Sequence, residues 1–161
     1  MKVCSRLFLA ALLLAGAATV SGAQTFSSGL RAATVLPGPV VKLKPGETIE
    51  VPVSIQIRPA YHINSSQPAD EYLIPTALTW EPSGLDLKQT DYPEPEFVSY
   101  PFSSQPVSVY SNKIVIVSRF AVPDNAPALT QLKGRLRYQA CNSKACFPPT
   151  STDVTVAVAV P

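Results

Sequence analysis

The sequence predicts an all-β protein, specifically an immunoglobulin-like β-sandwich, from three observations. Apolar and polar residues alternate with a period of two in several runs after residue 39, which is typical of half-buried strands. The same region lacks helical periodicity, and its prolines stand between the runs, where they interrupt helices and suit turns. Many short strands separated by such turns, in a chain of this length, favour a sandwich.

The first segment, residues 1–23, is expected to be a secretory signal peptide. Lys2 and Arg6 precede an apolar run of 14 residues, and small residues allow cleavage after Ala23. The run is shorter than the roughly 20 residues that cross a bilayer, which argues against an uncleaved anchor. Cys4 precedes the run, so lipidation is not expected. The mature chain is therefore expected in the periplasm or secreted, with no transmembrane segment.

The mature chain is expected to form one domain. Residues 24–38 are polar, small and irregular, and are predicted to be a flexible N-terminal extension before a sandwich over residues 39–161. Loss of Lys2 and Arg6 lowers the Lys plus Arg count from 13 to 11, which equals the 11 Asp plus Glu. A net charge of zero gives no reason to expect a nucleic acid or an anionic membrane as a partner.

Four runs, over residues 51–57, 114–120, 132–138 and 154–160, show the strand pattern best. Pro52 lies in the first run and favours a sheet edge. The second run is apolar on both faces, which predicts a central strand. Weaker strand candidates are residues 40–44, 61–64, 77–80, 85–88 and 107–110.

A segment over residues 92–106 is unusually rich in prolines and aromatic residues, with four of each. Aromatic rings on a stiffened loop can cover a functional site. They can equally pack onto the loop's own sandwich, and composition leaves both interpretations open.

Cys141 and Cys146 are the two cysteines of the mature chain, and an exported pair normally forms a disulfide. The turn-forming residues 142–144 between them make this bond geometrically plausible. A loop of six residues gains only about 2 kcal/mol in the chain-entropy model. A disulfide between residues so close in sequence stabilises the fold only weakly, and another thiolate can reach it easily. Spacing alone leaves a structural and a redox-active bond both open, and Lys144 either favours a thiolate or is simply solvated.

The motif Tyr138-Gln139-Ala140-Cys141, followed by Cys146-Phe147-Pro148-Pro149, resembles the active-site hairpin of the N-terminal periplasmic domain of the DsbD family of thiol:disulfide interchange reductases. Residues 60–65 (Ala-Tyr-His-Ile-Asn-Ser) and 73–76 (Leu-Ile-Pro-Thr) are weaker matches. The resemblance extends from about residue 40 to residue 160, which is nearly all of the mature chain. It implies an immunoglobulin-like sandwich, in agreement with the strand pattern.

The resemblance also implies a thiol:disulfide oxidoreductase component with Cys141 and Cys146 as its catalytic pair and no other cofactor. The pair would accept electrons from a membrane carrier and reduce thioredoxin-like periplasmic proteins, of the disulfide isomerase or cytochrome c maturation type. Cys146 would attack, by analogy with the family's second cysteine. The chain ends at Pro161, where DsbD continues, so the electron donor is expected to be a separate polypeptide.

By position, residues 91–102 are similar to the cap loop that shields the cysteine pair in that family. Phe97 is the expected shielding ring, with Tyr100 and Phe102 behind it. Tyr61, His62 and Tyr138 are expected around the pair. His62, the single histidine, would either tune a thiolate pKa or be a partly buried strand residue.

Two other site chemistries have weaker support. Both cysteines with His62 could bind copper or zinc, but Cu(I) favours methionines, of which only Met1 is present, and a closed zinc site lacks a fourth ligand. A hydrolase would have to combine His62 with Ser65 or Ser66 and Asp70, which lack a nucleophile-elbow motif.

The main alternative from another class is a binding or folding-assistance module whose disulfide is permanent. Lys133, Arg135 and Arg137 share one strand face, which is either solvated or guides an acidic partner. Whether the disulfide cycles distinguishes this module from an oxidoreductase.

Overall fold

The computed structural model describes residues 29–159, and this range contains strands and no helix. The first strands are β1 (Ala33–Val35), β2 (Val41–Lys42), β3 (Thr48–Ile57), β4 (His62–Asn64), β5 (Ala77–Trp80) and β6 (Asp86–Asp91). The remaining strands are β7 (Glu96–Val98), β8 (Val107–Tyr110), β9 (Lys113–Ala121), β10 (Gln131–Tyr138), β11 (Ala140–Cys141) and β12 (Thr150–Ala159).

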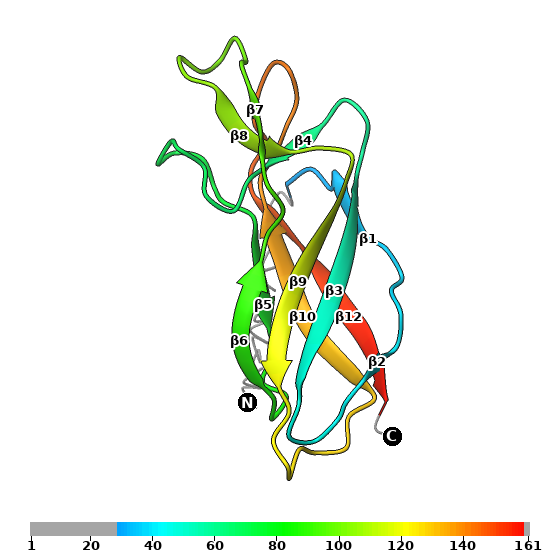
Figure 1. Ribbon diagram of the computed structural model, residues 1–161. Coiled ribbons are helices and arrows are strands. Elements are labelled where there is room, and N and C mark those ends of the chain that lie inside the picture. Colours follow the sequence, from blue (N-terminus) through cyan, green and yellow to red (C-terminus); the bar gives the residue numbers. More distant parts are fainter. Residues whose placement is uncertain (1–28, 160–161) are drawn as a thin grey trace, which may run out of the picture.

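Two four-stranded sheets form the body of the molecule, in the orders β1-β3-β9-β6 and β2-β12-β10-β5. A third sheet also has four strands, in the order β11-β4-β8-β7, but these strands are short. This small sheet lies at one end of the sandwich, at the top of Figure 1. All neighbouring strands are antiparallel except β2 and β12, which are parallel. The all-β sandwich expected from the sequence is confirmed.

The core follows from the period-two pattern, because each strand sends alternate side chains to opposite faces. Along β10, Leu132, Leu136 and Tyr138 are buried while the three basic residues between them are exposed. Inward-facing residues of both large sheets join in one hydrophobic cluster, which includes Phe120 from β9 and Val154 from β12.

The N-terminal boundary at residue 39 is a correction. Residues 33–35 form β1 and pair with residues 55–57 of β3, and Ala32 and Ala33 are buried. Tyr138 fixes this strand, since the Ala33 N–H donates to its hydroxyl at 3.3 Å. The sandwich therefore begins within the segment predicted to be flexible. Residues 1–28, which contain the expected signal peptide, lie outside the described residues.

Two details of the strand prediction also change. Strand β9 is central, as expected, but Val115 on its outer face is 40% exposed, so that only one face of the strand is fully covered. Strand β3 is internal rather than an edge, although β1 pairs only with its residues 55–57. The part of β3 around Pro52 therefore has a strand partner, β9, on one side only, which accommodates the missing N–H. Val160 lies outside the described residues.

The core strands place the motifs that carry the family resemblance at one end of the sandwich. After β3, a turn closed by the Tyr61 N–H and the Arg58 carbonyl (3.1 Å) leads into β4. Pro59 and Ala60, whose φ is +67°, occupy its central positions, as in a type II turn. Strand β10 continues into β11, which pairs with β4 so that Cys141 lies opposite His62. Within residues 29–159 there is no helix long and apolar enough to cross a membrane.

Candidate redox-active site

The hairpin that follows β11 carries a disulfide between Cys141 and Cys146, whose Cα atoms are 4.0 Å apart. The Asn142 N–H donates to the Ala145 carbonyl at 3.0 Å, and the Asn142 side-chain oxygen accepts the N–H groups of Lys144 (2.9 Å) and Ala145 (3.0 Å). These bonds fold the loop on itself, as the turn-forming residues predicted. The hairpin is thus preformed around the disulfide.

The two sulfur-bearing residues differ in accessibility. Cys141 is 0% exposed, because it lies in β11 against β4, whereas Cys146 is partly exposed on the return of the hairpin. An incoming thiolate therefore reaches the bond from the Cys146 side. Charge on a sulfur is also easier to solvate there, since burial disfavours a thiolate.

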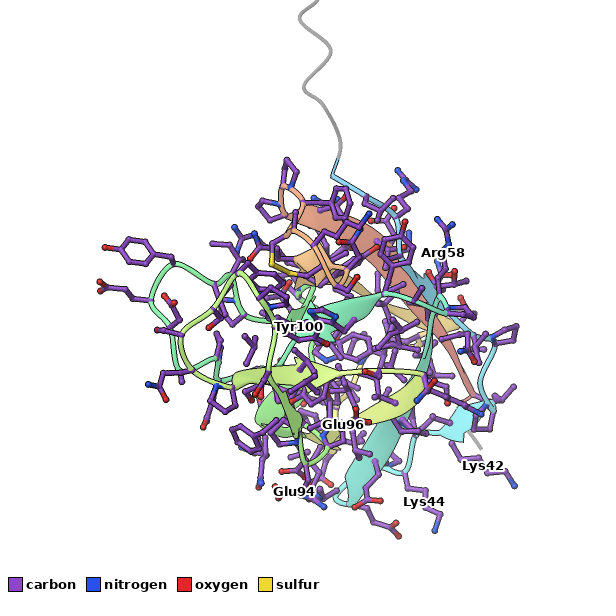
Figure 2. All side chains as sticks on the ribbon, turned by 90° about the horizontal axis from the view of Figure 1, so that it is seen from above. Lys42, Lys44, Arg58, Glu94, Glu96 and Tyr100 are labelled. Atoms are coloured by element: carbon purple, nitrogen blue, oxygen red, sulfur yellow. A yellow bond between two sulfur atoms is a disulfide. The ribbon has the colours of Figure 1, made fainter. Side chains whose placement is uncertain are left out.

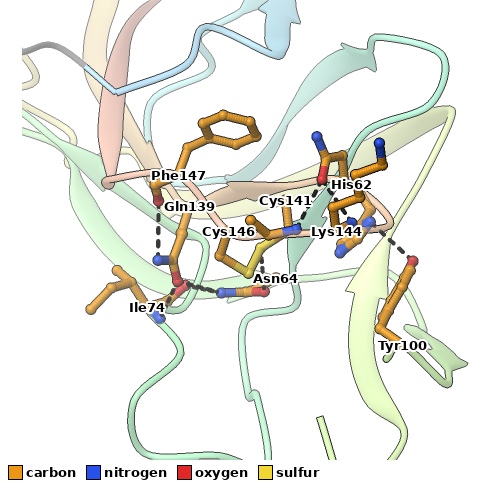
Figure 3. The surroundings of a disulfide bond; sticks show 11 residues. His62, Asn64, Ile74, Tyr100, Gln139, Cys141, Lys144, Cys146 and Phe147 are labelled. Carbon is orange, nitrogen blue, oxygen red and sulfur yellow. Dashed lines mark hydrogen bonds between the residues drawn. A yellow bond between two sulfur atoms is a disulfide. The ribbon is translucent and has the colours of Figure 1, made fainter. Parts of the chain in front are cut away.

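A partly buried polar cluster lies beneath the disulfide (Figure 3). The Asn64 side-chain amide donates to the Ile74 carbonyl and to the Gln139 side-chain oxygen, both at 3.0 Å. Gln139 also accepts the Ile74 N–H at 3.0 Å and donates to the Phe147 carbonyl at 3.1 Å. The cluster links β4, the loop at Ile74 and both arms of the hairpin, and thereby fixes the hairpin on the sandwich.

His62 lies beside the hairpin and is 4% exposed. Its Nδ1 shares a hydrogen bond of 2.9 Å with the Tyr100 hydroxyl, and the two rings stack with centroids 4.4 Å apart. Its Nε2 has no hydrogen-bond partner among the described residues. Burial lowers the pKa of His62 from 6.5 to about 4, so that the imidazole is neutral at pH 7.

Acid is therefore expected to destabilise the protein through His62. Between pH 6.5 and pH 4 the unfolded chain binds a proton at this residue and the folded chain does not, so the free energy of unfolding falls as the pH falls. The loss reaches about 3 kcal/mol at pH 4. Urea unfolding at several pH values, compared with a His62→Asn variant, measures it. Equal pH slopes in the two proteins would show that His62 is not held neutral.

The expected cap segment contacts the site through Tyr100. This ring stacks on His62 and on Phe102, whose centroid is 5.2 Å away. Burial, with a smaller contribution from the Glu96 carboxylate, raises the pKa of Tyr100, which therefore stays a phenol at neutral pH. Figure 2 looks onto this end of the molecule and shows Tyr100 between the disulfide and Glu96.

Phe97 has a different position from Tyr100. Part of the expected loop is strand β7, and Phe97 lies on it opposite Ser108 of β8, at the edge of the small sheet farthest from β11. Its side chain is 69% exposed. Within the segment, Tyr100 thus stacks on both His62 and Phe102, whereas Phe97 points to solvent.

The two remaining aromatic residues have distinct surroundings. The centroid of the Tyr61 ring lies 6.2 Å from that of Phe147, the residue that directly follows Cys146. The Arg58 guanidinium lies 5.1 Å from the centroid of the Tyr61 ring. Tyr138 is 0% exposed in the core and anchors β1. Tyr61 therefore belongs to the hairpin surroundings, whereas Tyr138 supports the sandwich.

The other predicted constellations are not assembled. No group of three or more His, Cys, Asp or Glu side chains suited to a metal occurs within residues 29–159. The hydroxyl of Ser65 accepts a hydrogen bond from Ser108 at 2.7 Å, and the Asp70 carboxylate accepts the N–H of Tyr72 at 2.9 Å. His62 bonds Tyr100 instead of either residue.

Sequence reasoning did not identify Asn64 and Gln139 as site residues, although both lie in the motifs that carry the resemblance. They are 75 positions apart, and no local pattern shows that they meet. The available signal was Asn64 itself, a polar residue at the end of the candidate strand over residues 61–64, since a buried amide requires hydrogen-bond partners.

The fold and the hairpin together define the class of protein, an immunoglobulin-like sandwich with a disulfide-closed hairpin at one end. Comparison with known families assigns residues 32–158 to the model described as "Thiol:disulfide interchange protein DsbD, N-terminal". This chain belongs to the DsbD N-terminal domain family. No curated protein sequence matches it significantly.

A solved structure of low sequence identity has the same fold. The N-terminal periplasmic domain of ScsB from Proteus mirabilis superposes with a TM-score of 0.54 at 15% identity, over 78% of this chain and 51% of that one. The N-terminal domain of Neisseria meningitidis DsbD in its reduced form has a TM-score of 0.45 at 19% identity, over 71% of this chain and 80% of that one. This chain therefore aligns with about half the length of the ScsB structure.

Proposed function

We propose that this protein is an exported thiol:disulfide interchange module that passes electrons through Cys141 and Cys146 to oxidised partner proteins. The observation that carries the proposal is a six-residue disulfide loop in which Cys141 is buried and Cys146 is partly exposed. Such a loop adds little stability to a sandwich that already has a continuous core. Membership of the DsbD N-terminal domain family supports the same chemistry.

The exchange begins with both cysteines reduced. The Cys146 thiolate attacks the partner's disulfide, forming a mixed disulfide and releasing one partner thiolate. Cys141 then loses its proton, and its thiolate attacks the Cys146 sulfur. The Cys141–Cys146 bond forms as the second partner thiolate leaves. Two electrons pass to the partner, and the protons of the two thiols end on the partner's dithiol.

The partners that suit this chemistry are thioredoxin-like proteins of the periplasm, of the disulfide isomerase or cytochrome c maturation type. A membrane electron carrier would reset the cysteine pair. The periplasmic origin of the ScsB domain supports this location. Three aromatic side chains from the loops and the small sheet are exposed and available to contact a docking protein, those of Tyr72, Phe97 and Phe102.

Electron transfer tests the proposal directly. The purified protein, reduced and freed of reductant, is mixed with an oxidised thioredoxin-fold disulfide isomerase. The free thiols of both proteins are then labelled with a reagent that adds a known mass, so that the redox state of each protein can be followed over time. One partner disulfide is expected to be reduced for each Cys141–Cys146 bond formed, faster than by the same concentration of glutathione. Transfer no faster than by glutathione would contradict an exchange function.

Shielding by the cap segment predicts a difference between two ring deletions. Tyr100→Ala removes the stack on His62 and is expected to increase the rate of disulfide reduction by dithiothreitol severalfold. Phe97→Ala, the matched control, removes a ring that is 69% exposed and is expected to leave the rate unchanged. Stopped-flow reduction kinetics measure both. Acceleration by Phe97→Ala alone would assign the shielding to Phe97, and equal rates in all proteins would exclude shielding by either ring.

A further inference from the structure

We propose that Asn64 holds the proton on Cys141 in the reduced protein, with its side-chain oxygen accepting a hydrogen bond from the Cys141 thiol. This inference rests on the proposed function, since it concerns the dithiol state of the same pair. It assigns Asn64 a role in deciding which cysteine attacks. Gln139 is the positioning residue that aims the Asn64 amide.

The orientation of the two amides follows from the backbone. The Ile74 N–H is only a donor, so the Gln139 atom 3.0 Å away is its oxygen, and the Phe147 carbonyl is only an acceptor, so the atom 3.1 Å away is the Gln139 nitrogen. The Gln139 oxygen and the Ile74 carbonyl then both require the NH₂ group of Asn64, at 3.0 Å from each. Only the oxygen of Asn64 remains to face the cysteine.

That oxygen lies 3.8 Å from the Cys141 sulfur, and both residues are 0% exposed (Figure 3). A disulfide sulfur has no proton to donate, so in the oxidised protein the pair is only in contact. Reduction adds a proton to each sulfur, and the contact then becomes an S–H···O hydrogen bond. A thiolate at Cys141 would instead face the negative end of the amide dipole without water.

Two consequences follow for the exchange. The hydrogen bond favours the protonated form of Cys141, which leaves the more exposed Cys146 to form the attacking thiolate. The bond exists only in the dithiol, so it also stabilises the reduced protein relative to the disulfide. The other titratable groups around the hairpin, His62 opposite Cys141, Tyr100 against His62, and Lys144 in the loop, stay the same when Asn64 is replaced.

Asn64→Leu removes the acceptor while keeping a side chain of similar size. Loss of one hydrogen bond from the reduced state is expected to shift the glutathione equilibrium about fivefold towards the disulfide, a potential about 20 mV lower at about 30 mV per tenfold change. In the reduced protein, Cys141 is expected to react with iodoacetamide at a lower pH than in wild type. Mass spectrometry assigns each alkylated cysteine.

Thr76→Val is the matched control. The Thr76 hydroxyl donates to the Asn64 backbone carbonyl at 2.6 Å, so this variant removes a buried hydrogen bond at the same residue but leaves the side-chain oxygen in place. Its redox equilibrium and alkylation profile are expected to match wild type. A shift as large as that of Asn64→Leu would show that general loosening, rather than the acceptor, controls the pair, and would overturn the proposal.

Asn64→Asp keeps an oxygen towards Cys141 and provides a second test if the leucine variant does not fold. Its potential is expected to be no lower than that of wild type, and a decrease equal to that of an acceptor-free variant would overturn the proposal. If the wild-type potential lies in the exchanger range and Asn64→Leu does not change it, the role of Asn64 is contradicted but the proposed function is not. A wild-type potential typical of structural disulfides would contradict the proposed function itself.

Discussion

A Cys141→Ser variant is expected to accumulate a stable mixed disulfide with an oxidised thioredoxin-like protein. Cys146 is partly exposed and can still attack, but the serine cannot displace the partner from its sulfur. Wild type would resolve the same adduct and release the partner. Non-reducing electrophoresis after mixing the two proteins detects the adduct, and peptide mass spectrometry shows whether Cys146 is the bonded residue.

Cys146→Ser is the matched control. It leaves only Cys141, which is 0% exposed against β4 and faces the Asn64 oxygen. Little or no adduct is expected, and electron transfer should be lost in both variants. An equal or greater yield through Cys141 would reverse the order of attack. No adduct in either variant would argue for a permanent structural bond.

Leu136→Ala is expected to cost about 2–5 kcal/mol of unfolding free energy, the range for truncating a buried leucine. Leu136 is 0% exposed in the middle of β10, opposite Leu78 of β5 on one side and Thr152 of β12 on the other. Its cavity would lie between the two sheets, where neighbouring side chains can collapse only in part. Urea denaturation followed by tryptophan fluorescence measures the change, since Trp80 packs on Phe120 in the same core.

Arg135→Ala on the same strand provides the control. Its side chain is 66% exposed, and it pairs with the 84% exposed side chain of Asp153 at 3.5 Å. Such a surface pair contributes at most about 1 kcal/mol, so the variant should stay close to wild type. A comparable loss in both variants would mean that β10 is sensitive along both faces and that the inward face is not the core.

The long strands were predictable because their burial is periodic over eight to ten residues, as in β3 and β10. The short strands β1, β7 and β11, of two or three residues, were not. A period of two needs several repeats to stand out, and these segments are extended because a neighbouring strand pairs with them. The expected flexible extension and cap loop were each partly strand for this reason.

The site was predictable to a different extent. The Cys141–Cys146 bond was expected from the cysteine count and spacing, and the structure contains it. The family match confirms the resemblance on which the proposed exchange chemistry rests. The packing of Tyr100 on His62 and the meeting of Asn64 with Gln139 join residues 38 and 75 positions apart. Contacts of this kind depend on how β4, the cap segment and the hairpin converge, which no local pattern encodes.

The reduction potential of the Cys141–Cys146 pair tests the central claim most directly. Equilibration of the purified protein with glutathione or dithiothreitol buffers, followed by thiol labelling, gives the value. Thiol exchange predicts a potential between about −180 and −270 mV, among the known exchangers. A potential below about −300 mV would mark a structural disulfide, and the protein would then be a binding module rather than an electron carrier.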